Sequence, residues 1–142
     1  MSRVQLALNV QNLQESIAFY SKMFGTEPAK VREGYANFAI SEPPLKLVLI
    51  ETKSDGVSEY QHLNHLGVEL ESAQLVEQAI DTFSDLGLVE KIEKNETCCF
   101  AVQDKVWMTS PDGAPWEYYT VLADAPAFRT NIAVLPGGDC CS

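Results

Sequence analysis

Positive charge is scarce in this sequence and is nowhere clustered. Its 142 residues include 10 Lys and Arg against 20 Asp and Glu, which gives a net charge of −10. Nucleic acid and anionic membrane surfaces are therefore unfavourable partners. The sequence also lacks a charged-then-apolar signal pattern at its N-terminus and any apolar run of membrane-spanning length. We therefore expect a protein of the cytoplasm that binds neither nucleic acid nor membrane.

Histidine and cysteine, the usual ligands of transition metals, are also few. The two histidines are His62 and His65, and the four cysteines form two adjacent pairs, Cys98-Cys99 and Cys140-Cys141. A disulfide scaffold spreads its cysteines along the chain, whereas a bridge between neighbouring residues strains the peptide between them. The spacing favours thiols that serve chemistry or soft-ion binding, and the alternative is a pair of small buried core residues.

The most informative feature that is present is an internal repeat. Residues 4–10 align with 64–70 at an offset of 60, and residues 35–51 align without a gap with 105–121 at an offset of 70. Each half contains an amphipathic helix pattern, capped by Asn12 in the first half and by Ser72 in the second, and ended by a glycine. Strand-like stretches follow each helix, at 28–33, 35–41 and 45–51 and at 88–93, 98–103, 105–110 and 115–122.

This repeat predicts an α+β fold in which two tandem β-α-β-β-β modules form one curled mixed sheet. The predicted domain covers residues 1–122, with module one at about 3–51, a polar linker at 52–62 and module two at about 63–122. Residues 123–142 contain Pro and Gly and end in cysteines, so we expect an irregular tail there.

Aligning the two halves places candidate metal ligands at matched strand positions. Gln5 falls opposite His65, and Leu47 falls opposite Glu117. Four such side chains can surround a shared centre, and of these four only Leu47 cannot bind a metal. Glu117 lies between two aromatic residues on an apolar strand, where an unpaired carboxylate would be costly. Gln5, His65 and Glu117 therefore form an N/O set with open positions, which predicts a metalloenzyme; a solvated glutamine and a structural histidine are the alternatives.

The chain resembles the vicinal oxygen chelate superfamily, which includes glyoxalase I, bleomycin-resistance proteins and extradiol dioxygenases. The resemblance covers about residues 3–122 and rests on the repeat, the Asn-capped helix and the Ser110–Gly113 turn followed by Trp116-Glu117. It implies a glyoxalase/bleomycin-resistance-like curled sheet. Four strings further resemble the cadmium-induced and organoarsenical C–As lyase branch: RVQL at 3–6, YANFAI at 35–40, NHLGVE at 64–69 and TCCFA at 97–101.

That branch implies Fe(II) held by Gln5, His65 and Glu117, although another divalent metal can occupy such a site. It also implies that Cys98 and Cys99 bind a trivalent organoarsenical. The C–As bond of a methyl or aromatic arsenical would then be cleaved with O₂ to release arsenite. Adjacent thiols suit soft arsenic if residues 97–99 lie in a loop or at a bulge. The nearby lysines at 91, 94 and 105 could lower the pKa of these thiols.

Three other functions compete with this one. The chain could bind arsenic or cadmium under stress without turnover, act as another metal-dependent enzyme of the glyoxalase or thiol-transferase type, or bind drugs without a metal. The missing fourth ligand at Leu47 counts against a glyoxalase I type, and the three polar ligands count against the metal-free type. Modules in this superfamily pair either within one chain or across a homodimer, so both arrangements stay open. We assign no catalytic role to Cys140 or Cys141.

Overall fold

The computed structural model describes residues 2–52, 62–98 and 100–124. Within these residues, two helices and eight strands follow one another in two runs of the same type. Module one contains β1 (Arg3–Val10), α1 (Leu13–Phe24), β2 (Lys30–Arg32), β3 (Tyr35–Ile40) and β4 (Leu45–Glu51). Module two contains β5 (Leu63–Glu69), α2 (Ala73–Asp85), β6 (Lys91–Cys98), β7 (Ala101–Thr109) and β8 (Pro115–Asp124).

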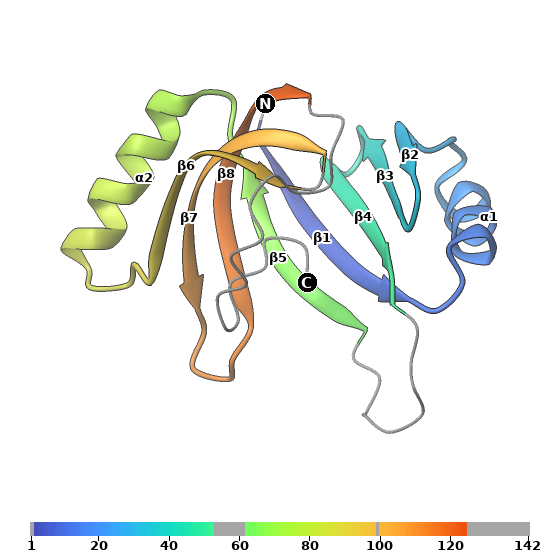
Figure 1. Ribbon diagram of the computed structural model, residues 1–142, viewed down its shortest axis with the longest axis horizontal. Helices are drawn as coiled ribbons and strands as arrows, with labels where there is room; N and C mark the ends of the chain where they lie inside the picture. Colours follow the sequence, from blue (N-terminus) through green and yellow to red (C-terminus); the bar gives the residue numbers. More distant parts are fainter. Residues whose placement is uncertain (1, 53–61, 99, 125–142) are drawn as a thin grey trace.

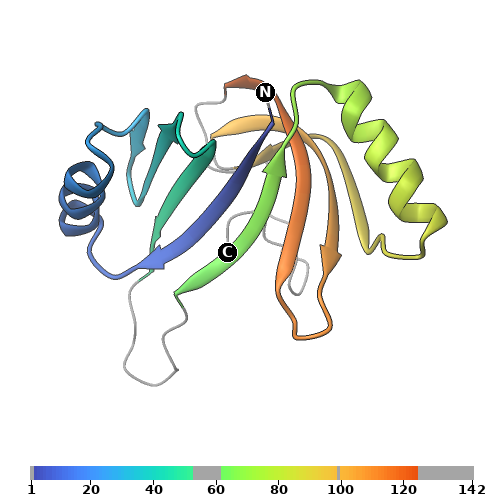
Figure 2. The same ribbon diagram turned by 180° about the vertical axis from the view of Figure 1, so that it is seen from behind.

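All eight strands belong to one mixed sheet in the order β2-β3-β4-β1-β5-β8-β7-β6. Within each module the first and last strands are parallel, β1 with β4 and β5 with β8, and the modules join through the antiparallel pair β1–β5. The modules therefore pair within one chain. Figure 1 shows the sheet curling between α1 and α2, which lie at opposite ends, and Figure 2 shows the same arrangement from behind. The predicted α+β fold is confirmed.

The helices begin where the sequence predicts them. Asn12 Oδ1 accepts a hydrogen bond from the backbone N–H of Glu15 at 3.0 Å, and Ser72 Oγ accepts one from the N–H of Leu75 at 3.2 Å. Each bond satisfies one of the free N–H groups of a first helical turn. Gly25 ends α1 in the left-handed conformation (φ 64°), where a side chain would be strained.

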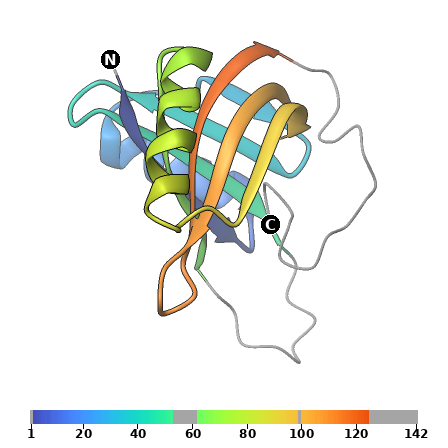
Figure 3. The ribbon, with the colours of Figure 1, turned by 90° about the vertical axis from the view of Figure 1, so that its left-hand side faces the viewer.

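Strand alternation gives the sheet two different faces. On the outer face, Leu47 and Leu49 of β4 join Val10 and Leu13 in a core that packs against α1. On the inner face, Ala7 of β1 joins a second cluster, which also contains Tyr35, Val48, Ile50, Phe100 and Trp107. Figure 3, viewed from the side of α2, shows the strands curving around this inner face. Polar side chains buried inside the curve are therefore shielded from water.

Two details of the strands differ from the sequence-based expectation. The stretches predicted as separate strands at 98–103 and 105–110 form one strand, β7, and the strand predicted at 88–93 is β6, which begins at Lys91. Leu47 is also not the counterpart of Glu117. Ala7 pairs with Val48, and Gly67, which lies 60 positions after Ala7, pairs with Glu117. The counterpart of Glu117 is therefore Val48, and Leu47 faces α1.

Several expectations concern residues that the structure does not describe. The linker, apart from its ends, and the tail beyond Asp124 lie outside the described residues, as do Cys99, Cys140 and Cys141. Among the helices that are described, none is long and apolar enough to cross a membrane.

Candidate metal centre

The three residues predicted as ligands meet on the inner face of the sheet. Gln5 lies on β1, His65 on β5 and Glu117 on β8, three strands that are neighbours at the middle of the sheet. All three are buried, with 4%, 3% and 2% of their surface exposed. Gln5 Nε2 lies 3.0 Å from His65 Nε2 and 2.8 Å from Glu117 Oε1, and His65 Nε2 lies 3.5 Å from Glu117 Oε1.

These distances fit three ligands on one face of a metal. Ligand atoms at right angles around a first-row metal, each roughly 2.1 Å from it, lie roughly 3 Å from one another. One of the three is an amide, and the described residues contain no group of three His, Cys, Asp or Glu side chains placed to bind a metal. An amide oxygen is a weaker donor than an imidazole, so we expect modest metal affinity at this site.

A bulge in β5 orients the His65 ring. The register between β1 and β5 shifts by one residue after the pair Ala7–His65, which brings the neighbouring Asn64 side chain against the ring. Asn64 Oδ1 lies 2.8 Å from His65 Nδ1, and Asn64 Nδ2 donates to Asn9 Oδ1 at 2.8 Å. Because this amide presents its oxygen to Nδ1, the proton belongs on Nδ1 and the Nε2 lone pair faces the cluster.

The Gln5 amide is held at both ends. Its nitrogen faces His65 and Glu117, and its oxygen accepts a hydrogen bond of 2.5 Å from the Tyr119 hydroxyl. An oxygen ligand requires the amide to turn by half a rotation. Since a tyrosine hydroxyl can accept as well as donate, Tyr119 satisfies the amide in both orientations. The donor set therefore fits a divalent cation.

Lys105 pairs with the carboxylate of Glu117. Its Nζ donates to Glu117 Oε2 at 2.9 Å, and the side chains are 1% and 3% exposed. Burial alone would raise the pKa of Glu117, but the charge of Lys105 outweighs burial and holds the pKa below its usual value. Glu117 is therefore ionised throughout the neutral range and available as an anionic ligand.

Gly67 makes room for this cluster. A Cβ atom at Gly67 would lie 2.9 Å from the carbonyl oxygen of Glu117, 3.0 Å from its Cγ and 3.3 Å from Gln5 Nε2. Such contacts are shorter than carbon and polar atoms tolerate without shifting. The absent side chain thus allows β5 and β8 to bring His65 and Glu117 to one point.

The predicted thiol pair lies at the end of β6. Cys98 is the last residue of that strand and pairs with Ala101 of β7, and Cys99 is outside the described residues. The next residue, Phe100, has a left-handed backbone (φ 64°) and packs its ring against Tyr35 on the inner face, with 5.5 Å between centroids. Lys30 of β2 donates to the carbonyl oxygen of Phe100 at 3.2 Å. Phe100 is therefore anchored to module one.

The lysines expected to act on the thiols are engaged elsewhere. Lys91 lies 3.2 Å from Glu93, Lys94 contacts Glu77, and Lys105 contacts Glu117. Each cation already faces a carboxylate, and Cys99 lies outside the described residues, so their effect on a thiol pKa stays a prediction.

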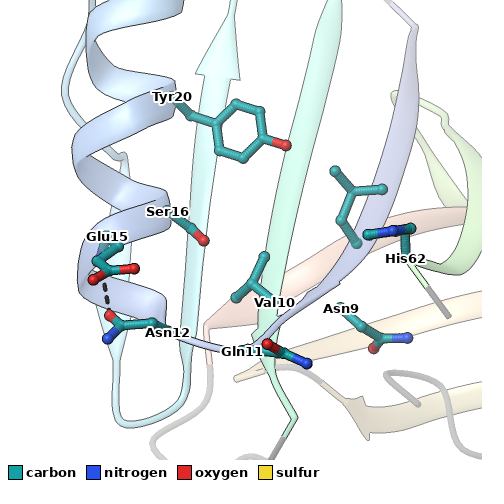
Figure 4. A pocket seen from close by; sticks show the side chains of 9 residues that line it. Asn9, Val10, Gln11, Asn12, Glu15, Ser16, Tyr20 and His62 are labelled. Atoms are coloured by element: carbon teal, nitrogen blue, oxygen red, sulfur yellow. Dashed lines mark hydrogen bonds between the residues drawn. The ribbon is translucent and has the colours of Figure 1, made fainter. Parts of the chain in front are cut away.

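A pocket of about 630 Å³ lies away from the cluster, between the end of β1 and the first turns of α1. Figure 4 shows Glu15, Ser16 and Tyr20 facing it from the helix, with Asn9 and His62 on the opposite side. None of the three predicted ligands lines it. The pocket and the cluster are thus separate features of the molecule.

Sequence reasoning missed three contributors to the cluster, which are Lys105, Tyr119 and Asn64. Asn64 is adjacent to His65 in sequence, so its role in holding the ring had a local signal. Lys105 and Tyr119 reach the cluster from β7 and β8, and only the register of those strands reveals that they face inward.

Two paired modules, one curled mixed sheet and a buried N/O donor set on its inner face together define an α+β protein built from two repeated halves. The sequence model of the glyoxalase/bleomycin resistance protein/dioxygenase superfamily matches residues 3–118, and the chain belongs to that superfamily. A Mn(II)-bound glyoxalase from Novosphingobium aromaticivorans has a similar fold, with a TM-score of 0.60 at 18% identity over 94% of this chain and 44% of the other.

Much closer relatives exist in sequence. The chain is 56% identical to the cadmium-induced protein CadI of Mycobacterium tuberculosis over 131 residues, which cover 92% of this chain and 84% of the relative. It is 50% identical to a trivalent organoarsenical cleaving enzyme of Thermomonospora curvata, over 99% of this chain and 100% of that one. The predicted resemblance to this branch is therefore confirmed.

Proposed function

We propose that this protein is an Fe(II)- and O₂-dependent C–As bond lyase that degrades trivalent organoarsenicals to arsenite. The observation that carries the proposal is the convergence of Gln5, His65 and Glu117 on one buried point, in a chain 50% identical to an enzyme named for cleaving trivalent organoarsenicals. The substrate class comes from that relative, and the chemistry comes from the donor set.

In this proposal Gln5, His65 and Glu117 hold the metal from one side. Bound Fe(II) would supply redox chemistry and open coordination positions for O₂. Asn64 keeps the Nδ1 proton of His65 in place, and Tyr119 holds the Gln5 amide. The buried inner face excludes bulk water from the three ligands, which are at most 4% exposed.

Cys98 and Cys99 are proposed to bind the arsenic. A trivalent organoarsenical with two hydroxyl groups reacts with two thiols: two As–S bonds replace two As–O bonds, each hydroxyl leaves as water with a thiol proton, and the carbon substituent stays on arsenic. Phe100, directly after the pair, belongs to the same inner cluster as Trp107, whose ring lies 5.4 Å from that of His65. Phe100, which follows the two cysteines in sequence, thus lies on the face that carries the candidate ligands.

The test is purified protein loaded with Fe(II) and mixed with methylarsenite in air. We expect arsenite to accumulate as O₂ is consumed, measured by arsenic speciation and an oxygen electrode. Glu117→Ala should lose bound Fe(II) but still bind the arsenical, and Cys98→Ser should do the reverse. A Cys140→Ser/Cys141→Ser background removes the other thiol pair. Loss of both metal and arsenical in each single variant would contradict two separate sites.

The second candidate is a protein that binds arsenic or cadmium under stress without turnover. The 56% identity to the cadmium-induced protein favours it. It predicts tight binding of the soft ion at Cys98 and Cys99 with no arsenite formed, so the same assay separates the two candidates.

A further inference from the structure

The charge of Glu117 is compensated before any metal binds. Lys105 Nζ lies 2.9 Å from Glu117 Oε2, and both side chains are almost fully buried. The Gln5 amide is neutral, and the His65 ring is neutral when its only proton lies between Nδ1 and Asn64. The four side chains together therefore carry no net charge, which lowers the free-energy cost of burying the metal-free cluster.

Lys105 also decides which carboxylate oxygen faces the other ligands. Oε2 accepts from Lys105, whereas Oε1 lies toward Gln5 and His65. The ammonium sits between two aromatic rings, 5.5 Å from the centroid of Trp107 and 5.7 Å from that of Tyr119. The faces of these rings favour a cation at this position beside Glu117.

The two modules show that this lysine accompanies the carboxylate. By sheet register, the module-one counterpart of Glu117 is Val48, and that of Lys105 is Tyr35. Tyr35 accepts a hydrogen bond from Asn37 and has no charge to neutralise at Val48. Module two, which has the buried anion Glu117, thus has the buried cation Lys105 where module one has Tyr35.

We propose that Lys105 is a built-in counter-ion of the metal site: it stabilises the metal-free protein, presents Oε1 of Glu117 to the metal, and weakens the binding of divalent cations. This inference rests on the proposed function, because it requires a metal at Gln5, His65 and Glu117. Orientation by Lys105 favours binding, but a fixed positive charge close to a divalent cation opposes it. In a buried site the charge term is the larger one.

The test measures Mn(II) affinity, by the loss of the free-ion electron paramagnetic resonance signal, together with the thermal unfolding of the metal-free protein. Lys105→Met removes the charge and the donor, Lys105→Gln removes the charge but keeps a donor for Oε2, and Lys105→Arg keeps both. We expect the Met and Gln variants to bind Mn(II) on the order of tenfold more tightly than the wild type, and the Arg variant to bind like the wild type.

We further expect the metal-free Met variant to unfold at a lower temperature than the wild type. If Lys105 served only as structural support, its loss would lower both the unfolding temperature and the Mn(II) affinity. Tighter Mn(II) binding by a less stable variant therefore distinguishes the counter-ion role from structural support. If the Met variant does not fold without metal, the Gln variant decides the question.

Equal or weaker Mn(II) binding in the neutral variants, while the wild type binds Mn(II), would overturn this inference alone. Failure of the wild type to bind Mn(II) or Fe(II) would overturn the proposed function, and the inference with it.

Discussion

Modules one and two share a fold but not a chemistry. Module two supplies His65 and Glu117, with Lys105 beside them, whereas module one supplies Gln5 and has Val48 at the position that matches Glu117. Module one also has Ala7 where module two has Gly67. A duplicated scaffold can thus place the charged groups of one site in one half, while the other half supplies a neutral ligand and apolar walls.

The largest loss of stability should come from a carboxylate introduced into β4, on its outer or its inner face. Leu47 is 1% exposed and packs against the α1 core, so Leu47→Glu buries an unpaired charge and should cost about 4 kcal/mol or more. Val48→Glu places the carboxylate at the counterpart of Glu117, on the inner face. In denaturant unfolding with EDTA, we expect Val48→Glu to lose less free energy of unfolding than Leu47→Glu. Mn(II) should restore at least part of the free energy that Val48→Glu loses.

Val48→Leu is the matched control for size, and Mn(II) should stabilise it no more than the wild type. Rescue of Leu47→Glu by the metal, with none for Val48→Glu, would show that the register between the modules is the one expected from the ungapped alignment.

The next effect concerns the residue that differs in size between the halves. Gly67→Ala places a Cβ 2.9 Å from the carbonyl oxygen of Glu117, and should cost roughly 1–3 kcal/mol and weaken Mn(II) binding. Ala7→Gly makes the reverse change in module one and should cost about 1 kcal/mol or less, with Mn(II) affinity unchanged. Urea unfolding and Mn(II) titration measure both. Unchanged Mn(II) affinity in Gly67→Ala would mean that the glycine serves the strand rather than the cluster.

The sequence predicted the features of this site that follow a repeat. Matched helix caps at Asn12 and Ser72 and matched strands at Gln5 and His65 required no knowledge of the tertiary fold. The slip from Leu47 to Val48 could not be found in this way. Lys105 and its partner Tyr119 are 14 residues apart along the chain, one fewer than their counterparts Tyr35 and Ile50, and a shift of one residue exchanges the two faces of a strand.

Lys105 escaped prediction for a different reason. The expected strands at 98–103 and 105–110 leave Asp104 between them, whereas Gln103, Asp104 and Lys105 form a continuous stretch of β7. The stretch belongs to β7 because Lys105 finds its partner on the next strand, at Glu117. A charge inside a sheet is predictable only once the partner strand and its register are known.

The smallest effect should come from the ion pair that crosses the module boundary. Glu69 of β5 contacts Arg3 and lies 3.3 Å from Lys46 Nζ, both on module one. Burial alone would raise the pKa of Glu69, but the charges of Lys46 and Arg3 outweigh burial and lower the pKa below its usual value of 4.5. A carboxyl whose pKa is lowered by folding contributes stability above pH 4.5, and loses it as the pH falls through the folded-state value.

Glu69→Gln should therefore lower the free energy of unfolding by about 1 kcal/mol at neutral pH, and the difference from the wild type should shrink as the pH falls below 4.5. Urea unfolding in EDTA measures both proteins across this range. Combining Glu69→Gln with Lys46→Met gives a double-mutant cycle. The loss of stability in the double variant should be smaller than the sum of the two single losses, because each single substitution already breaks the Glu69–Lys46 pair. A difference that stays constant into acid, or losses that add, would place the junction of the modules in the β1–β5 backbone pairing instead of this ion pair.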